Sequence, residues 1–192
     1  RGQGKAGAYG EFMIETDHHV GRILELLDQE KLAHNTLVIY TSDNGPETTW
    51  KQRAEKFSHQ SNGIYREGKR SIYEGGHRVP FFIRWPAKVK PGSKLNAPIC
   101  QTDLLATLAE MLGEKLPNNA GEDSNSFYAE MLAPDTVKNR PPIIHHSSQG
   151  RFAIREGKWK LIMPGKKKAM NPQLYDLNKD PGETVNLAKK NP

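Results

Sequence analysis

The strongest constraint on the fold is a β-rich apolar run, Thr-Leu-Val-Ile-Tyr-Thr at residues 36–41, which ends in Ser-Asp-Asn-Gly-Pro. The preceding residues 9–32 place apolar side chains at helical spacing and predict one amphipathic helix. An all-apolar run that follows a helix is typical of a strand buried on both faces of a parallel or mixed sheet. The helix–strand order therefore predicts α/β architecture.

The stretch that follows this strand predicts one more strand and one more helix. Residues 46–78 are polar without a sustained period, which favours a long functional loop. Residues 79–85 return to strand character. A Thr-Asp pair at residue 102 can cap a helix that Gly113 ends. One helical turn is expected near residues 127–132.

The last part of the chain predicts a small antiparallel meander. Short apolar runs lie at residues 143–146, 151–155, 158–163 and 174–177. Glu156-Gly157 is a plausible two-residue hairpin turn between two of these runs. We therefore divide the chain into residues 1–142, which hold the α/β part, and residues 143–192, which form an antiparallel subdomain.

The charge is uneven along the chain. The 192 residues carry 28 lysines and arginines against 22 acidic residues, a formal net charge of +6. Residues 51–94 hold 11 basic and 3 acidic residues, and residues 151–170 hold 7 and 1. Two such segments suit a local anion site, and aromatic residues are not interleaved with them, so we expect no nucleic-acid partner. No apolar run approaches the roughly 18 residues of a membrane span.

Asp43, Asn44 and Gly45 follow directly on the predicted buried strand. Ligands collect at the carboxyl ends of strands in open α/β sheets. Adjacent carboxylate and amide oxygens there suit a hard cation such as Ca²⁺ or Mg²⁺. The same three residues are also ideal for a plain turn. On these residues alone, both interpretations stay open.

A second polar segment surrounds Lys69, in Gly-Lys-Arg-Ser-Ile-Tyr-Glu-Gly-Gly-His-Arg-Val-Pro at residues 68–80. A lysine ammonium is a compact positive charge that suits a tetrahedral oxyanion. The Gly75-Gly76 pair permits close approach of the backbone. The alternative interpretation of this segment is a solvated basic loop.

These segments, taken in order, resemble the formylglycine-dependent sulfatase family within the alkaline phosphatase superfamily. The motifs that carry the resemblance lie at residues 41–45, 68–80, 153–162 and 174–188. Together they cover nearly the whole chain, from about Tyr9 to Lys190. The resemblance implies part of an alkaline phosphatase-like sheet sandwiched by helices, followed by a small antiparallel C-terminal subdomain with a packed helix.

The resemblance also implies roles for five residues. Asp43 and Asn44 would be ligands of an active-site Ca²⁺. Lys69 would be a catalytic residue that contacts the sulfate and stabilises the charge developing there. His145 or His146 would reach the substrate, a sulfate ester of an aryl group or a carbohydrate, with a structural histidine as the alternative for each. The other residues that match the second motif would shape its loop.

The nucleophile of the family has no counterpart in this sequence. The family needs a Cys- or Ser-x-Pro-x-Arg segment whose first residue becomes formylglycine, whereas Cys100 lies in Ile-Cys-Gln-Thr-Asp. The remaining metal-binding aspartates also belong to the upstream half of the family. We therefore expect a C-terminal fragment that is inactive alone and requires the N-terminal remainder of the enzyme. The resemblance implies a periplasmic, extracellular or lysosomal location, although no signal in the chain indicates one.

Two other functions remain as alternatives. One is a phosphodiesterase or phosphonate hydrolase of the same superfamily, which would share the motif after the strand. The other is a non-catalytic module that binds sulfated glycans through a basic groove. The run Lys166, Lys167 and Lys168 would attract such a polyanion, although lysine runs are more often solvated turns.

Overall fold

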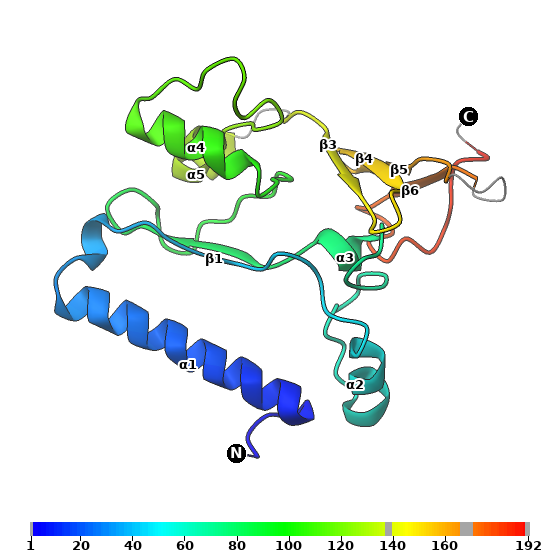
Figure 1. Ribbon diagram of the computed structural model, residues 1–192, viewed down its shortest axis with the longest axis horizontal. Coiled ribbons are helices and arrows are strands. Elements are labelled where there is room, and N and C mark those ends of the chain that lie inside the picture. The colour runs from blue at the N-terminus through cyan, green and yellow to red at the C-terminus, as the bar shows by residue number, and fades with distance from the viewer. Residues whose placement is uncertain (1, 137–139, 166–170, 191–192) are drawn as a thin grey trace.

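The computed structural model describes residues 2–136, 140–165 and 171–190. Within these ranges it contains a two-stranded sheet and a four-stranded sheet, joined by helices and long connections (Figure 1). The lysine run at residues 166–168 lies outside the described residues. No helix in the described ranges has both the length and the apolar character needed to cross a bilayer.

The first sheet lies between helices, as the sequence predicts. Its strands are β1 (Val38–Thr41) and β2 (Phe81–Arg84), with α1 (Gly7–Gln29) on one side and α4 (Asp103–Leu112) and α5 (Tyr128–Leu132) on the other (Figure 1). Short 3₁₀ turns lie at Ala33–Asn35 (η1) and Pro134–Thr136 (η2). The α/β class and the helix-covered sheet are therefore confirmed.

Helix α1 is close to its predicted extent but contributes no buried residue to the fold. Of the predicted stripe, Met13 and Ile23 are 39% and 58% exposed, whereas the other members are half-buried: Thr16, Val20, Leu24 and Leu27. An ion pair of 3.0 Å between Asp28 and Arg84 ties the end of the helix to β2. The apolar stripe that the sequence predicts is thus only partly covered in the part of the chain that the structure describes.

Strand β1 forms where expected, and its environment differs from the prediction. It pairs antiparallel with β2, from Val38 opposite Arg84 to Thr41 opposite Phe81. All of its residues are half-buried, so the expected burial on both faces is wrong. The physical reason is that α1 covers its side of the sheet only loosely, while the side facing α4 and α5 is well packed.

That well-packed side forms one of the two cores. Trp85, Phe127 and Met131 are buried there, and the rings of Phe81 and Phe127 meet edge to face with centroids 6.0 Å apart. Residues next to β1, from β2 and the connection after it, and from α4 and α5 surround them: Leu37, Ile83, Ala87, Val89, Ile99, Leu104, Met111 and Tyr128. This core fixes the first sheet against the helices that follow it.

The expectation of a structureless stretch over residues 46–78 is wrong. It contains α2 (Trp50–Phe57) and ends in α3 (Glu74–His77). Helix α2 is short, and its buried face includes a cation: Arg53 is buried, with its guanidinium carbon 3.9 Å from the ring centroid of Tyr9. Because a charged residue takes a central position on that face, the apolar period of this eight-residue helix is weak in the sequence.

The predicted meander is confirmed as a four-stranded antiparallel sheet in chain order. Glu156 pairs with Trp159, so the hairpin turn is Gly157-Lys158 and the predicted Glu156-Gly157 is one residue too early. Gly157 adopts φ 52°, a left-handed conformation that costs glycine little. The strands are β3 (Ile143–His146), β4 (Phe152–Glu156), β5 (Trp159–Ile162) and β6 (Gln173–Asp176).

The second sheet packs against the segment that leads into α3. Ile72 and Tyr73 share one buried cluster with Ala153, Ile162, Tyr175 and Leu177. The helix that packs on this sheet is therefore α3, which comes from the first predicted unit. This core contains residues from both sides of residue 142. The division of the chain into residues 1–142 and 143–192 stays a prediction.

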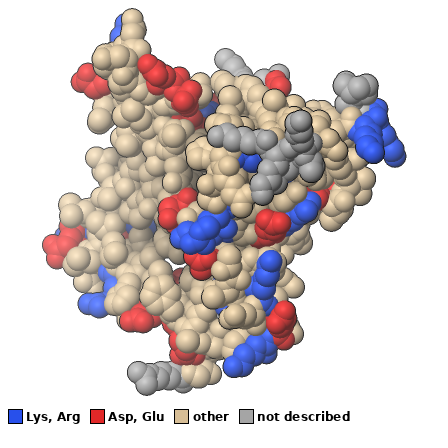
Figure 2. Space-filling view, turned by 45° about the vertical axis from the view of Figure 1, so that its right-hand side comes forward, with Lys and Arg blue, Asp and Glu red and all other residues tan. Residues whose placement is uncertain are grey.

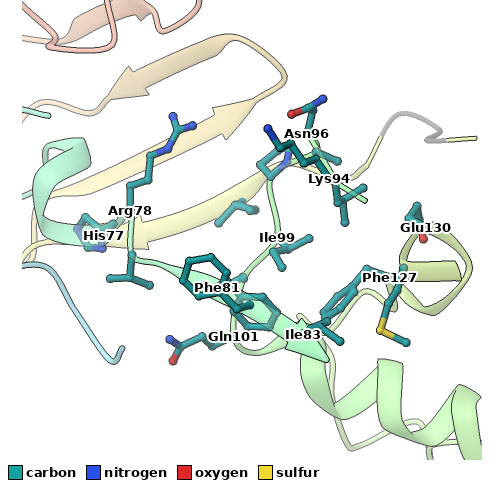
Figure 3. A pocket seen from close by; sticks show the side chains of 18 of the residues that line it. His77, Arg78, Phe81, Ile83, Lys94, Asn96, Ile99, Gln101, Phe127 and Glu130 are labelled. Atoms are coloured by element: carbon teal, nitrogen blue, oxygen red, sulfur yellow. The ribbon is translucent and has the colours of Figure 1, made fainter. Parts of the chain in front are cut away.

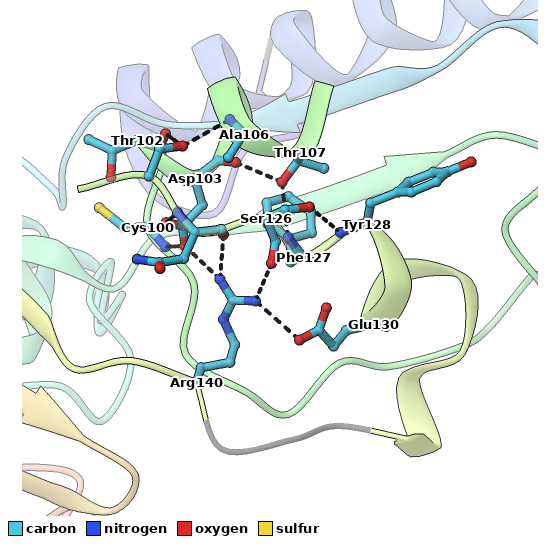
Figure 4. A network of polar contacts seen from close by, with 12 residues as sticks. Cys100, Thr102, Asp103, Ala106, Thr107, Ser126, Phe127, Tyr128, Glu130 and Arg140 are labelled. Carbon is cyan, nitrogen blue, oxygen red and sulfur yellow. Dashed lines mark hydrogen bonds and ion pairs between the residues drawn. The ribbon is translucent and has the colours of Figure 1, made fainter. Parts of the chain in front are cut away.

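A buried ion cluster ties α4 to the segments that follow it (Figure 4). Arg140 contacts the carboxylate of Asp103 at 3.1 Å and that of Glu130 at 3.3 Å. The side chains of Arg140 and Asp103 are only 5% and 4% exposed. The second carboxylate oxygen of Asp103 accepts the backbone N–H of Asn125 at 2.9 Å. One arginine thus neutralises the buried carboxylate of Asp103 and the half-buried carboxylate of Glu130.

We expect Arg140→Met to lower the free energy of unfolding of the protein by about 3–5 kcal/mol, because it leaves the buried carboxylate of Asp103 without a counter-charge. Urea unfolding measures the effect. Asp28→Asn is the matched control: its ion pair with Arg84 is solvent-exposed and is worth about 0–1 kcal/mol. Equal losses in the two variants would contradict the prediction.

Candidate functional site

The turn after β1 has both properties that the sequence left open. The Asp43 carboxylate accepts the backbone N–H of Asn44 at 3.0 Å, and the Asn44 amide donates to the carbonyl of Gly45 at 3.2 Å. These are the hydrogen bonds of a turn. The turn also presents Asp43 and Asn44 together on one cavity wall. The turn and the oxygen-ligand interpretations are therefore compatible.

Gly45 sets the position of this turn. Its backbone N–H donates to the carbonyl of Gly76 at 3.0 Å. A Cβ atom at Gly45 would lie 1.7 Å from the carbonyl oxygen of Gly75, which no structure tolerates. The turn therefore packs backbone against backbone on α3, and only glycine permits this approach.

Lys69 is held on the facing loop beside the same turn. Its backbone N–H donates to the carbonyl of Pro46 at 2.9 Å, and its ammonium lies 3.9 Å from the Glu47 carboxylate. Glu47 has a closer partner in Arg70 at 2.6 Å, and this hydrogen bond lowers the pKa of Glu47 to about 2. Glu47 is thus charged at neutral pH, and the Lys69 ammonium keeps a weak ion pair that an incoming anion can replace.

One cavity of about 1360 Å³ joins these groups (Figure 3). All five residues that the sequence singled out line it: Asp43, Asn44, Lys69, His145 and His146. The wall facing the first core is apolar and includes Phe81, Ile83, Ile99 and Phe127. The structure brings the five residues together, and their roles stay predictions.

The two histidines differ in environment. His145 is half-buried, with its ring centroid 4.3 Å from that of His77, and burial lowers its pKa to about 3. His146 is exposed, and its ring lies 5.6 Å from that of Phe152. A neutral His145 cannot deliver a proton near neutral pH. If it meets a substrate, it does so as an uncharged imidazole.

Three residues that the sequence motifs did not single out for the site also line the cavity. His77 lies against His145, and its Nε2 atom, like that of His145, is buried without a hydrogen-bond partner among the described residues. Arg78 lines the cavity with its guanidinium 4.7 Å from the ring of Tyr65. Gln101 donates to the carbonyl of Ser42 at the end of β1. Only the motif position of Arg78 gave a signal in the sequence.

The oxygen atoms of the turn are of the type that a hard cation binds, but there are too few of them to complete its coordination. Asp43 and Asn44 offer a carboxylate and an amide oxygen, which Ca²⁺ accepts. Ca²⁺ takes about six to eight oxygen ligands. Within the described ranges no group of three or more histidine, cysteine, aspartate or glutamate residues is arranged to hold a metal ion. Further ligands would have to come from beyond these residues.

The charges around the site are mixed. On the face drawn in Figure 2, basic and acidic side chains are interspersed, so the described residues there form no continuous basic surface. The cavity lining includes Lys69, Arg70 and Arg78 together with Asp43 and Asn44, and further cations lie elsewhere along it. This is an α/β protein whose strand end and facing loop suit a cation and an anionic ester side by side.

The chain belongs to the sulfatase family. The family model for sulfatases matches residues 3–114. The model for the C-terminal part of N-sulphoglucosamine sulphohydrolase matches residues 63–192. The resemblance that the sequence motifs carry is thereby confirmed.

Individual relatives agree with the family models. An N-acetylgalactosamine-6-O-sulfatase of Bacteroides thetaiotaomicron is 38% identical over 207 residues, covering 100% of this chain and 40% of the relative. A solved structure from work on the metabolism of multiple glycosaminoglycans by Bacteroides thetaiotaomicron has a TM-score of 0.86 at 37% identity, over 97% of this chain and 42% of that one. A crystal structure of Ps i-CgsB in complex with k-i-k-neocarrahexaose has a TM-score of 0.80 at 27% identity, over 97% and 40%. The chain spans about two fifths of the length of these relatives.

We expect Gly45→Ala to destabilise the protein and to disturb the turn, because the added methyl group collides with the backbone of α3. Gly21→Ala is the matched control, since nothing lies within 4 Å of a Cβ at that helical position. The control is expected to stabilise by about 0.5–1 kcal/mol through helix propensity. Thermal unfolding of both variants tests this. An unchanged melting temperature for Gly45→Ala would contradict the close packing of Gly45 on α3.

The buried His145 makes stability fall in acid. The unfolded imidazole takes up a proton near pH 6.5, whereas the folded group has a pKa of about 3, so the unfolded state binds more protons between these values. Stability therefore falls as the pH falls through this window, by at most about 1.4 kcal/mol per pH unit for one proton. Urea unfolding from pH 7 to pH 4.5 measures the slope. We expect a smaller slope for His145→Gln, and identical slopes would refute the assignment.

Proposed function

We propose that the intact protein hydrolyses sulfate esters. The observation that carries the proposal is the meeting of Asp43, Asn44 and Lys69 on one cavity in a chain of the sulfatase family. Lys69 contacts the sulfate and stabilises the negative charge that grows on it as the ester bond breaks. Its weak pairing with Glu47, at 3.9 Å, leaves its charge ready for this anion.

Calcium and formylglycine complete the proposed site. Asp43 and Asn44 supply two of the Ca²⁺ ligands, and their oxygen donors are of the kind that this ion prefers. When bound, the ion stabilises negative charge as a Lewis acid. The nucleophile, a formylglycine formed from cysteine or serine, comes from outside this chain. The residues of the chain bind the sulfate and keep the metal-facing turn in place.

The remainder of a larger sulfatase is required for this site. Two observations support this proposal: the chain spans about two fifths of the length of its relatives, and α1 has no fully buried residue and leaves Phe12, Ile23 and Leu26 exposed among the described residues. Two oxygen ligands alone hold Ca²⁺ weakly. We therefore expect the 192-residue chain by itself to bind Ca²⁺ weakly and to lack turnover.

The proposed substrate is a sulfated carbohydrate. The relative that covers the whole chain is an N-acetylgalactosamine-6-O-sulfatase, and one similar structure holds a neocarrahexaose. A cavity of about 1360 Å³ accommodates more than a single sulfate group. Arg78 and Lys94 line it beyond Lys69 and can pair with further anionic groups of a glycan. His145 and His146 line the same cavity and are the proposed contacts to sugar hydroxyls.

The full-length protein that carries this chain provides the test. We expect it to release sulfate from an aryl sulfate and from 6-sulfated N-acetylgalactosamine. Lys69→Ala should lower kcat by about 10²–10³-fold, the usual loss for one charge-stabilising group. Lys56→Ala, on the exposed face of α2, is the matched control and should leave kcat unchanged.

The outcomes also separate the alternatives. Faster hydrolysis of phosphate diesters or phosphonates than of sulfate esters would favour the other hydrolases of the superfamily. Saturable binding of a sulfated glycan by the 192-residue chain without any turnover by the full-length protein would favour the glycan-binding module. No sulfate release by the full-length protein would refute the proposal.

A further inference from the structure

A buried ion cluster links α3, which follows the loop that carries Lys69, to the second sheet. Its centre is Glu74, the first residue of α3, whose side chain is 3% exposed. One carboxylate oxygen lies 3.1 Å from the ammonium of Lys160 on β5, and the other lies 2.7 Å from the guanidinium of Arg155 on β4. The single acidic side chain of α3 therefore contacts two strands of the second sheet.

Glu183, in the segment after β6, closes the cluster. One of its carboxylate oxygens accepts the backbone N–H of Glu74 at 2.6 Å, and the other lies 2.8 Å from the Lys160 ammonium. Lys160 and Glu183 are both 0% exposed. Burial raises the pKa of Glu183, and the positive charge of Lys160 acts against this effect by favouring the ionised carboxylate. Side chain and backbone of Glu74 are thus both held from the C-terminal part of the chain.

The cluster reaches the proposed site through backbone contacts without side chains in between. Next to Glu74, the N–H of Gly75 donates to the carbonyl of Arg66 at 2.9 Å, and the carbonyl of Gly76 accepts the N–H of Gly45 at 3.0 Å. A Cβ at Gly75 would lie 2.1 Å from the carbonyl of Glu67. A displacement of α3 must therefore move both the turn after β1 and the loop that carries Lys69.

Stability alone does not explain such a cluster. A buried ion pair often contributes no more to stability than apolar residues of the same shape. Such a cluster does fix the relative orientation of its partners, because charged hydrogen bonds are short and lose strength when their partners move. Three contacts to Glu74, from β4, β5 and the segment after β6, fix both the rotation and the position of α3.

We propose that Glu74, Lys160 and Glu183 form a positioning cluster, through which the C-terminal part of the chain holds α3 and thereby aligns Asn44 and Lys69. None of the three is assigned contact with the substrate. The cluster acts through the Gly45–Gly76 contact. Its kinetic consequence rests on the proposed sulfatase activity, and its structural consequence does not.

The test uses Lys160→Met in the full-length protein, a change that removes the charge and keeps much of the side-chain volume. We expect kcat for an aryl sulfate to fall about 10- to 100-fold, the usual loss when a supporting residue of a site is removed. KM should change little, because the anion still meets Lys69. Hydrogen exchange of the Gly45 amide should become faster, since its acceptor on Gly76 is no longer held.

Arg140→Met is the matched control, because it removes the cation of a second buried cluster (Figure 4), whose ion pairs go to Asp103 on α4 and Glu130 on α5 and, among the described residues, not to the turn or α3. We expect it to lower the melting temperature while kcat and Gly45 exchange, measured well below that temperature, stay as in the wild type. If Lys160→Met behaves like this control, the cluster is merely structural and the proposal is refuted.

Two further variants keep the proposal testable if Lys160→Met folds poorly. Glu74→Gln retains the shape and the backbone N–H while weakening the contacts to both cations. Lys160→Met combined with Glu183→Gln restores the charge balance, and it should recover the melting temperature more than kcat. Absence of sulfate release by the wild type would refute the proposed function, and exchange at Gly45 would still decide the positioning role. Unchanged exchange in the folded variants would refute that role.

Discussion

The site depends on one close approach, the packing of Gly45 against the Gly75-Gly76 backbone of α3. No side chain intervenes, and a Cβ at Gly45 would overlap the Gly75 carbonyl oxygen. This contact brings the turn with Asp43 and Asn44 beside the loop of Lys69, although the two lie about two dozen residues apart in sequence. Backbone atoms cannot change rotamer, so such a contact transmits position more faithfully than side-chain packing does.

The basic residues of the chain have several different uses. From the sequence, we expected the excess of basic residues in 51–94 and 151–170 to form surfaces that face anions. In the structure, Arg53 is buried against Tyr9, and Arg155 and Lys160 neutralise Glu74. A part of the positive charge therefore holds the fold together, and the buried Arg53 and Lys160 are not available to a ligand. Lys69 and Arg78 do line the cavity, so the expected anion site draws on only a fraction of the positive charge.

The two sheets are mechanically connected, although they carry separate cores. The first core is apolar and joins β2 and Leu37, just before β1, to α4 and α5. The second joins β4, β5 and β6 to Ile72 and Tyr73 just before α3. The cavity lies where the two meet, and its predicted substrate contacts come from both: Lys69 from the loop before α3, His145 and His146 from β3. This arrangement explains why a peripheral sheet can take part in a site that begins at a strand end of the other.

The sequence by itself determined the helix-then-strand order and the meander, because periodicity and turn chemistry are local properties of the chain. Its ordered motifs also singled out five residues that line one cavity, and their roles stay predictions. Tertiary structure alone decided the antiparallel partner of β1, the existence of α2, and the burial of His145 and Glu74. Each of these depends on a neighbour distant in sequence: α2 on the contact between Arg53 and Tyr9, and Glu74 on Lys160, 86 residues later. Strand pairing and charge burial are properties of such contacts, and no local pattern encodes them.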